Sequence, residues 1–316
     1  MAYEVAILNA DVGPGAERYN NLILGPMTMG IEVTKPSLAE RCRLGNHDPQ
    51  HSLRGHSSAI EESMKCEIPP DGARLVTIKK DKDSLGTMAV WIVRLDGDDS
   101  FIDRRIVGWI GLIDRCGYAN AKQQSSSLAL VNRVHKYIKA MDVIVHQNPT
   151  HLTLASQVSH VARILTHDMP QDEIFYYASL CTPIIQRDFS KDAEWYNPIP
   201  ILYVKTDGEL RHARSWASNK APVVIIHASK SNGWNIVWRE DVRFDHVKFV
   251  TEINQIEALS RNMKVQELIN EGLAGGCGPT MWITPSGRGR GTKILNMKET
   301  LLKLVYSCYT ELPKSA

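Results

Sequence analysis

The chain has 316 residues, a length that suits one large domain or two domains of ordinary size. Hydrophobic residues make up 43% of it and charged residues 23%, which is ordinary for a globular, enzyme-sized protein. The formal net charge of +2 argues against general nucleic-acid binding, and no apolar stretch approaches the roughly 20 residues of a membrane span. The N-terminus lacks a basic leader and the six cysteines are scattered, so we expect a cytoplasmic protein with its cysteines as thiols.

The first regular segment of the chain follows a stretch that favours loops. Residues 1–8 predict a first strand, and glycines and prolines punctuate residues 9–70. Residues 73–78 then predict a short buried strand. From residue 85 to residue 93 apolar side chains recur at helical spacing, so a buried helix follows an Asp-rich turn. Such a strand–turn–helix unit is the building block of a parallel sheet.

The remaining pattern predicts two domains. Residues 1–190 form an α/β domain with a mainly parallel sheet and flanking helices, and residues 198–316 form a smaller α/β domain. A polar, proline-bearing stretch at residues 186–200 favours a linker between them. The expected helices span residues 126–146, 151–165, 257–271 and 298–310, and the expected strands span residues 201–205, 223–228 and 235–239.

The Asp-rich turn is the strongest candidate site. Asp81 and Asp83 follow the expected strand, and ligands bind at the carboxyl ends of strands in open α/β sheets. Alternate residues of a tight turn can direct two carboxylates at one Mn²⁺ or Mg²⁺ ion, while Gly86 permits close packing. The alternative is that Asp83 or Ser84 only caps the following helix.

Two further groups could complete a metal or catalytic site. His47, Asp48 and His51 lie together in one loop, where nitrogen and carboxylate ligands suit Mn²⁺, Fe²⁺ or Zn²⁺; the alternative is a solvated loop. Asp103 and Asp114 are close to three helical turns apart, so both could lie on one helix face and add to a carboxylate cluster. The alternative for this pair is two surface Asp–Arg ion pairs.

Glycine and arginine dominate a fourth segment. Gly275, Gly276 and Gly278 could let backbone N–H groups form an anion-binding nest. Arg288 and Arg290 could hold a phosphate or a carboxylate of the substrate. The alternative is a flexible glycine-rich loop.

Residues 75–90 resemble the first motif of the DHH phosphoesterase superfamily, in which a strand ends in an Asp-x-Asp turn and a buried helix follows. The Gly275-Gly276 segment loosely resembles the substrate-binding domain of that superfamily. The resemblance implies hydrolysis of phosphoesters or phosphoanhydrides with Mn²⁺ or Mg²⁺, with Asp81 and Asp83 as ligands and the glycine segment contacting the substrate anion. Thr77 stands where the motif has a histidine, and the sequence contains no Asp-His-His tripeptide.

We therefore expect a divalent-metal-dependent hydrolase of a phosphate-bearing small molecule or nucleotide, a small anionic substrate. The metal ligands would be Asp81, Asp83 and Asp114. The alternative, motivated by the missing histidines, is a catalytically inactive DHH-like protein that binds a ligand or a partner in a biosynthetic pathway. Nucleic-acid degradation has little support at this charge and 7% aromatic content, and a homo- or hetero-oligomer stays open.

Overall fold

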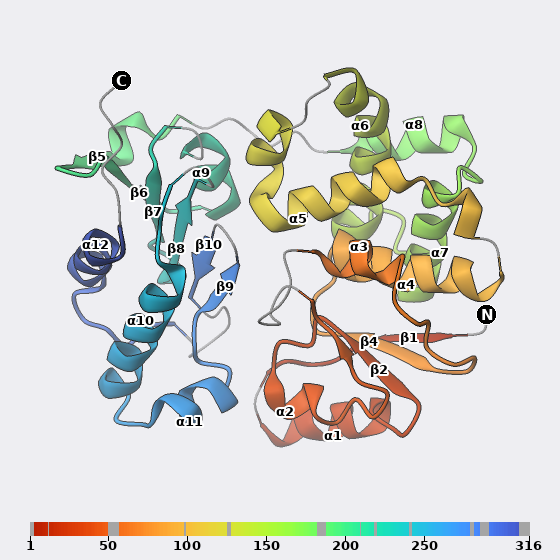
Figure 1. The fold of residues 1–316 in the computed structure, drawn as a ribbon, viewed down its shortest axis with the longest axis horizontal. Coiled ribbons are helices and arrows are strands. Elements are labelled where there is room, and N and C mark those ends of the chain that lie inside the picture. Colours follow the sequence, from red (N-terminus) through yellow and green to blue (C-terminus); the bar gives the residue numbers. More distant parts are fainter. Residues whose placement is uncertain are drawn as a thin grey trace. The chain divides into compact units, whose positions relative to one another are not determined.

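The computed structural model divides the chain into two compact units, Met1–Pro183 and Ile184–Ala316 (Figure 1). The sequence pattern had suggested a linker slightly later, at residues 186–200. The structure describes residues 3–11, 13–49, 57–97, 99–124, 128–181, 188–208, 210–217, 220–239, 242–278, 281–284 and 291–309.

Unit 1 is built on a four-stranded sheet in which every pair of neighbouring strands is parallel. Strand β4 is the expected strand at residues 73–78, and it lies between β1 and β2. The expected parallel sheet with flanking helices is therefore confirmed. In spatial order the strands are β1 (Glu4–Ile7), β4 (Arg74–Thr77), β2 (Thr28–Ile31) and β3 (Asn46–His47).

Helices cover both faces of this sheet because successive strand residues point to opposite faces (Figure 1). Leu75 packs into the large core cluster that contains residues of α4 and α7, whereas Val76 packs into a smaller cluster with Leu38 of α2. The helices and turns of unit 1 are α1 (Pro14–Ile23), α2 (Pro36–Ala39), α3 (Ala59–Ser63), α4 (Lys82–Leu95), a 3₁₀ turn (Asp99–Phe101), α5 (Arg104–Gln124), α6 (Leu128–Asp142), a π-helical turn (Val143–Gln147), α7 (Leu154–Leu165) and α8 (Gln171–Leu180).

The segment at residues 9–70, expected to be loop-rich, also contains regular elements that the sequence pattern did not reveal. This segment contains α1, α2 and α3 and the strands β2 and β3. Most of these elements are five residues long or shorter. They are therefore too short to show a helical or strand period between the glycines and prolines. Strand β2 nevertheless occupies an interior position of the sheet.

Unit 2 contains a six-stranded mixed sheet. Only β6 and β7 pair in parallel, and the other neighbouring pairs are antiparallel. In spatial order the strands are β5 (Ala193–Tyr196), β6 (Ile201–Thr206), β7 (Val223–Ala228), β8 (Gly233–Trp238), β10 (Met281–Ile283) and β9 (Gly276–Gly278). The expected smaller α/β domain is thus present.

Two apolar layers cover this sheet. Leu202 and Val224 pack against Ala213 and Ala217 of α9 on one face. On the other face, Tyr203 and Ile225 share a cluster with Phe249 of α10 and with residues of α12. The helices and turns of unit 2 are a 3₁₀ turn (Ser190–Asp192), α9 (Leu210–Ala217), α10 (His246–Ser260), α11 (Val265–Asn270) and α12 (Met297–Cys308).

The expected helix at residues 257–271 is two helices with a break between them. Helix α10 ends at Ser260, and α11 begins at Val265. Asn262 adopts a left-handed backbone conformation with φ of 55°, which a helix cannot include. The apolar periodicity runs through the break, so the sequence pattern gave no sign of it.

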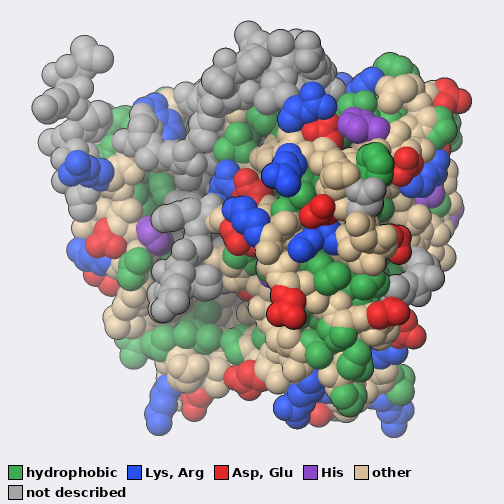
Figure 2. Space-filling model, turned by 45° about the vertical axis from the view of Figure 1, so that its right-hand side comes forward, with side chains coloured by type: hydrophobic (Ala, Val, Ile, Leu, Met, Phe, Trp, Pro, Cys, Tyr) green, Lys and Arg blue, Asp and Glu red, His purple; other side chains and the backbone are tan. Residues whose placement is uncertain are grey.

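Charged side chains of both signs are interspersed over the face drawn in Figure 2, in keeping with the small net charge. Among the described residues, no helix combines the length and the apolar character that crossing a membrane requires.

Candidate metal centre

Three carboxylates from distant parts of unit 1 converge on one point. Glu32, Asp83 and Asp114 each place an oxygen so that the three atoms lie within 4.8 Å of one another. Glu32 follows β2, Asp83 lies in the first turn of α4, and Asp114 lies in α5. Two of the three, Asp83 and Asp114, are residues that the sequence had nominated as metal ligands.

Glu32 reaches the cluster from a strained backbone. Its φ is 50°, a left-handed conformation that costs a residue with a side chain about 1 kcal/mol or more and that tends to occur at functional sites. Its backbone N–H donates to the carbonyl of His47, and its Oε2 accepts a 2.7 Å hydrogen bond from the Ser84 hydroxyl. The residue is only 2% exposed.

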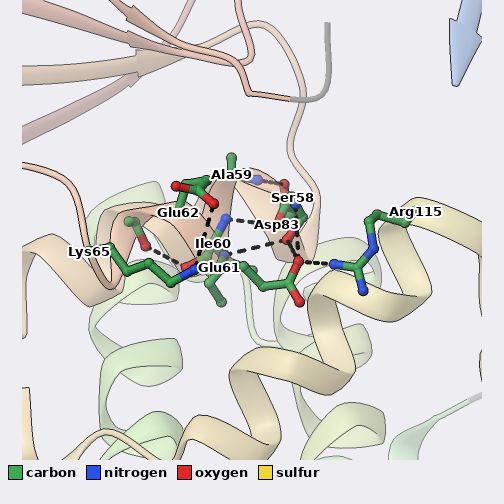
Figure 3. Close-up of polar contacts among 9 residues, drawn as sticks. Ser58, Ala59, Ile60, Glu61, Glu62, Lys65, Asp83 and Arg115 are labelled. Carbon is green, nitrogen blue, oxygen red and sulfur yellow. Dashed lines mark hydrogen bonds and ion pairs between the residues drawn. The ribbon is translucent and has the colours of Figure 1, made fainter. Parts of the chain in front are cut away.

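Asp83 is held by the N-terminus of α3. Its Oδ2 accepts from the N–H of Ala59 at 2.9 Å and its Oδ1 from the N–H of Ile60 at 3.0 Å (Figure 3). Each carboxylate oxygen can accept more than one bond, so both oxygens keep capacity for a further partner. Asp83 is buried, with 2% exposure.

Helix α3 positions the cluster because it connects to both α4 and α5. Its N-cap Ser58 and Glu61 form a capping box, and Glu61 also forms an ion pair with Arg115 of α5 (Figure 3). Two glycines permit α4 and α5 to approach α3 closely. A Cβ on Gly86 of α4 would lie 2.5 Å from Ile60 Cδ1, and one on Gly111 of α5 would lie 2.4 Å from the Glu61 carboxyl carbon.

Asp114 directly precedes Arg115, so the contacts between α3 and α5 also place its carboxylate beside the other two. It is the most accessible of the three. Asp114 is therefore the member of the cluster that solvent reaches most easily.

The electrostatics of the cluster favour a positive charge. Burial, together with the charges of Asp81 and Asp114, raises the pKa of Glu32 to about 8. Burial and the charges of Asp114 and Glu32 likewise raise the pKa of Asp83 well above its ordinary value. Because like charges this close cannot all ionise cheaply, the site either keeps protons or takes up a cation. Three oxygen donors suit a hard cation such as Mg²⁺ or Mn²⁺.

Asp81, expected to be a metal ligand, is not among the three carboxylates of this cluster. It is the N-cap of α4, and its Oδ1 accepts a 2.9 Å hydrogen bond from the Ser84 N–H. Helix capping was the alternative considered for this turn, but for Asp83 or Ser84 rather than for Asp81. The extended backbone of Asp81, with φ of −131°, turns its carboxylate toward the helix N–H groups. Its charge still acts on Glu32.

The expected catalytic loop does not join the carboxylates in the described residues. His47 lies in β3, where its Nε2 is 2.9 Å from the Ala59 carbonyl and its ring packs against Trp91 at 5.0 Å between centroids. Burial lowers the pKa of His47, so the ring is neutral and helps to fix the start of α3. Asp48 follows β3 and its charge acts on His47. His51 lies outside the described residues.

Asp103 and Asp114 do not share a site. Asp103 precedes α5, and its carboxylate pairs with Arg105 at 2.7 Å and with His167 Nε2 at 2.9 Å. These partners hold the pKa of Asp103 far below its ordinary range despite its burial. The ion-pair alternative therefore describes Asp103. Residues three turns apart on one helix face are still separated along the helix axis, so a shared face does not bring Asp103 and Asp114 together.

The glycine segment of unit 2 is extended. Gly276–Gly278 form β9 and pair with β10, and Gly275 lies under the indole of Trp282, where a Cβ would be 2.3 Å from Nε1. A nest needs successive residues of alternating helical hand, so the expected nest is not formed at Gly276 and Gly278. Their contact with a substrate anion stays a prediction. Arg288 and Arg290 lie outside the described residues.

The sequence interpretation missed Glu32. One signal was available, since Glu32 is a single acidic residue between the apolar residues Ile31 and Val33. A carboxylate directly after a strand has the same rationale as Asp81 and Asp83. The assignment of residues 9–70 to loops hid it.

Comparison with known proteins assigns no family. No family model matches the chain, and no curated protein matches it. The chain aligns with the crystal structure of an uncharacterised protein from Helicobacter pylori G27 at 9% sequence identity and a TM-score of 0.18. That alignment covers 97% of this chain and 98% of the other, and at this TM-score it carries no argument about fold or function.

Proposed function

We propose that unit 1 is a divalent-metal-dependent hydrolase of a phosphate-bearing small molecule or nucleotide. The observation that supports this is the convergence of Glu32, Asp83 and Asp114 within 4.8 Å. The sequence left two alternatives, an active hydrolase and an inactive binding protein. The cluster favours the hydrolase because it combines two buried carboxylates with an accessible one.

The three side chains fit a resident Mn²⁺ or Mg²⁺ ion. Carboxylate oxygens bind Mg²⁺ at about 2.1 Å, so two ligands of one ion lie at most about 4.2 Å apart, and the three oxygens lie within 4.8 Å of one another. The protein supplies three donors, which leaves coordination positions for water and for substrate. A bound cation would also relieve the repulsion that raises the pKa of Glu32 and Asp83.

The chemistry follows from the ligand set. A divalent cation at this site supplies an acidified water and neutralises charge on a phosphate oxygen. The residues around it keep the donors in place: Ser84 orients Glu32, and the N–H groups of Ala59 and Ile60 orient Asp83. Asp114, at the accessible side, is the ligand nearest to an incoming substrate.

Activity measurements test the proposal. Purified protein, stripped with EDTA and resupplied with Mn²⁺ or Mg²⁺, is assayed for phosphate release from a panel of phosphomonoesters, phosphodiesters and nucleotides. We expect metal-dependent turnover that falls at least 100-fold in Asp114→Asn and is kept in Asp71→Asn, an exposed residue outside the cluster. Metal binding without turnover on any substrate would favour the inactive, ligand-binding alternative.

A further inference from the structure

A pocket of about 520 Å³ opens in unit 2 at the ends of β6 and β7. Side chains of β6, β7 and β8 line one side of it, and residues 292–299, which lead into α12, line the other. The described lining comes entirely from unit 2 and shares no residue with the carboxylate cluster of unit 1.

The strand side of the pocket is a fixed row of side chains. Lys205 is the register partner of His227, and His227 is the register partner of Trp234, so the three lie side by side on one face of the sheet. The rings of His227 and Trp234 stack at 3.9 Å with 6° between their planes. The Tyr203 hydroxyl is 3.3 Å from His227 Nδ1. These contacts connect the side chains of the pocket wall to one another.

The pocket carries an excess of positive charge. Lys205 and Lys293 are exposed, and within the described part of the chain their ammonium groups have no hydrogen bond or ion pair. Lys298 lies 4.2 Å from the ring centroid of Tyr203 and pairs with Glu194 at 2.7 Å. Glu299 is the one carboxylate among the described lining residues.

His227 adds no charge to this wall. Burial is the main cause that lowers its pKa, and the nearby charge of Lys205 lowers it further. The imidazole is therefore neutral at neutral pH and supplies a flat surface rather than a cation. Lys205 and Lys293, which have no partner among the described residues, are then the groups that attract an anion.

The rim of the pocket is apolar. Leu295 is 98% exposed although it is a large hydrophobic residue, and Ile294 lies beside it. A ligand with both an anionic group and an apolar or ring-shaped part would bury this leucine while its anion contacts the lysines. Pockets that combine apolar walls with a few fixed polar groups are typical of small-molecule sites.

We propose that this pocket binds a small molecule through its phosphate group, with Lys205 and Lys293 as the phosphate-binding residues. Lysine binds phosphate as a point charge, and two ammonium groups on either side of a pocket can hold one dianion. The proposal does not rest on the metal centre, because it uses only residues of unit 2 and needs no metal ion.

The test is binding by the full chain in EDTA at low ionic strength. Inorganic phosphate and adenosine monophosphate are the probes, each followed by isothermal titration calorimetry and by the line width of its ³¹P NMR signal. We expect saturable binding that weakens at least tenfold in the double variant Lys205→Gln/Lys293→Gln. The control Lys191→Gln/Lys303→Gln removes two exposed lysines elsewhere in unit 2 and should bind as wild type does.

Each outcome of the titration decides something. Tighter binding of the nucleotide than of phosphate would support an organic phosphate that also contacts Leu295, and equal binding would support free phosphate. Absence of saturable binding of either probe, equal binding by the lysine double variant, or competition by acetate as strong as that by phosphate would overturn the proposal. The titration is run in EDTA, so the metal centre takes no part in it, and a failure here is distinct from a failure of the metal centre.

Discussion

The Ser84 hydroxyl donates a 2.7 Å hydrogen bond to Glu32 Oε2, although 52 residues separate the two in the sequence. Ser84 lies in the first turn of α4, one residue after Asp83, so this bond ties the end of β2 to the helix that carries a second carboxylate of the cluster. The donor favours the ionised form of Glu32 and opposes the burial that favours the neutral form. It therefore contributes both to the position and to the charge of a candidate metal ligand.

Ser84→Ala should weaken metal binding. Loss of the donor raises the pKa of Glu32 further and frees its side chain, so we expect affinity for Mn²⁺ to fall by about 10- to 100-fold at pH 7, the range that outer partners of metal ligands typically contribute. Isothermal titration calorimetry measures the affinity of each variant for Mn²⁺. Thr87→Ala is the matched control, because this buried hydroxyl of the same helix donates to the backbone carbonyl of Asp83 instead. If both variants lose affinity equally, the bond to Glu32 has no specific role.

The pH dependence of stability should depend on Glu32. Without metal, the folded protein keeps the Glu32 proton up to about pH 8, whereas the unfolded chain loses it near the ordinary value of 4.5. The folded state thus binds more protons between these values, and the free energy of unfolding falls as pH rises through this window. Asp83 contributes in the same direction.

Glu32→Gln should make that fall shallower. One pKa unit corresponds to about 1.4 kcal/mol, so the difference between wild type and variant should change by up to that amount per pH unit. Urea denaturation in EDTA at pH 5, 6, 7 and 8, followed by circular dichroism, gives the slopes. Parallel slopes for the two proteins would contradict the raised pKa of Glu32.

Gly86→Ala should destabilise unit 1 although alanine favours helices. The added Cβ would lie 2.5 Å from Cδ1 of the fully buried Ile60, so α3 or the Ile60 side chain must move. We expect a loss of about 1–3 kcal/mol, the usual cost of overpacking, and weaker metal binding because the N–H of Ile60 holds Asp83. Gly108→Ala in α5, whose Cβ would meet no atom within 4 Å, should instead stabilise by up to about 1 kcal/mol. Thermal unfolding of the two variants measures both changes in stability.

The strand–turn–helix unit of β4 and α4 could be predicted from the sequence because its signals are local. A short apolar strand, an Asp-rich turn and a buried helix follow one another without interruption. The choice between Asp81 and Asp83 could not be predicted. It depends on the extended backbone of Asp81, which makes it the cap, and on α3, whose N–H groups bind Asp83.

The rest of the site depends on tertiary contacts. Glu32 comes after a four-residue strand in a segment whose glycines and prolines favour loops, and its left-handed backbone has no sequence signature. Asp114 joins the cluster because α5 packs on α3 through Gly111 and the Glu61–Arg115 ion pair. Spacing along α5 suggested Asp103 as its partner, yet helical spacing alone cannot show which neighbour faces a residue.

Mn²⁺ binding tests the central claim most directly. Metal-free protein is titrated with Mn²⁺ and the free ion is followed by electron paramagnetic resonance, for wild type, Glu32→Gln/Asp114→Asn and Asp71→Asn. The account predicts one saturable Mn²⁺ per chain in wild type and in Asp71→Asn, with affinity at least tenfold weaker in the double variant. Absence of saturable binding in wild type, or unchanged affinity in the double variant, would contradict it.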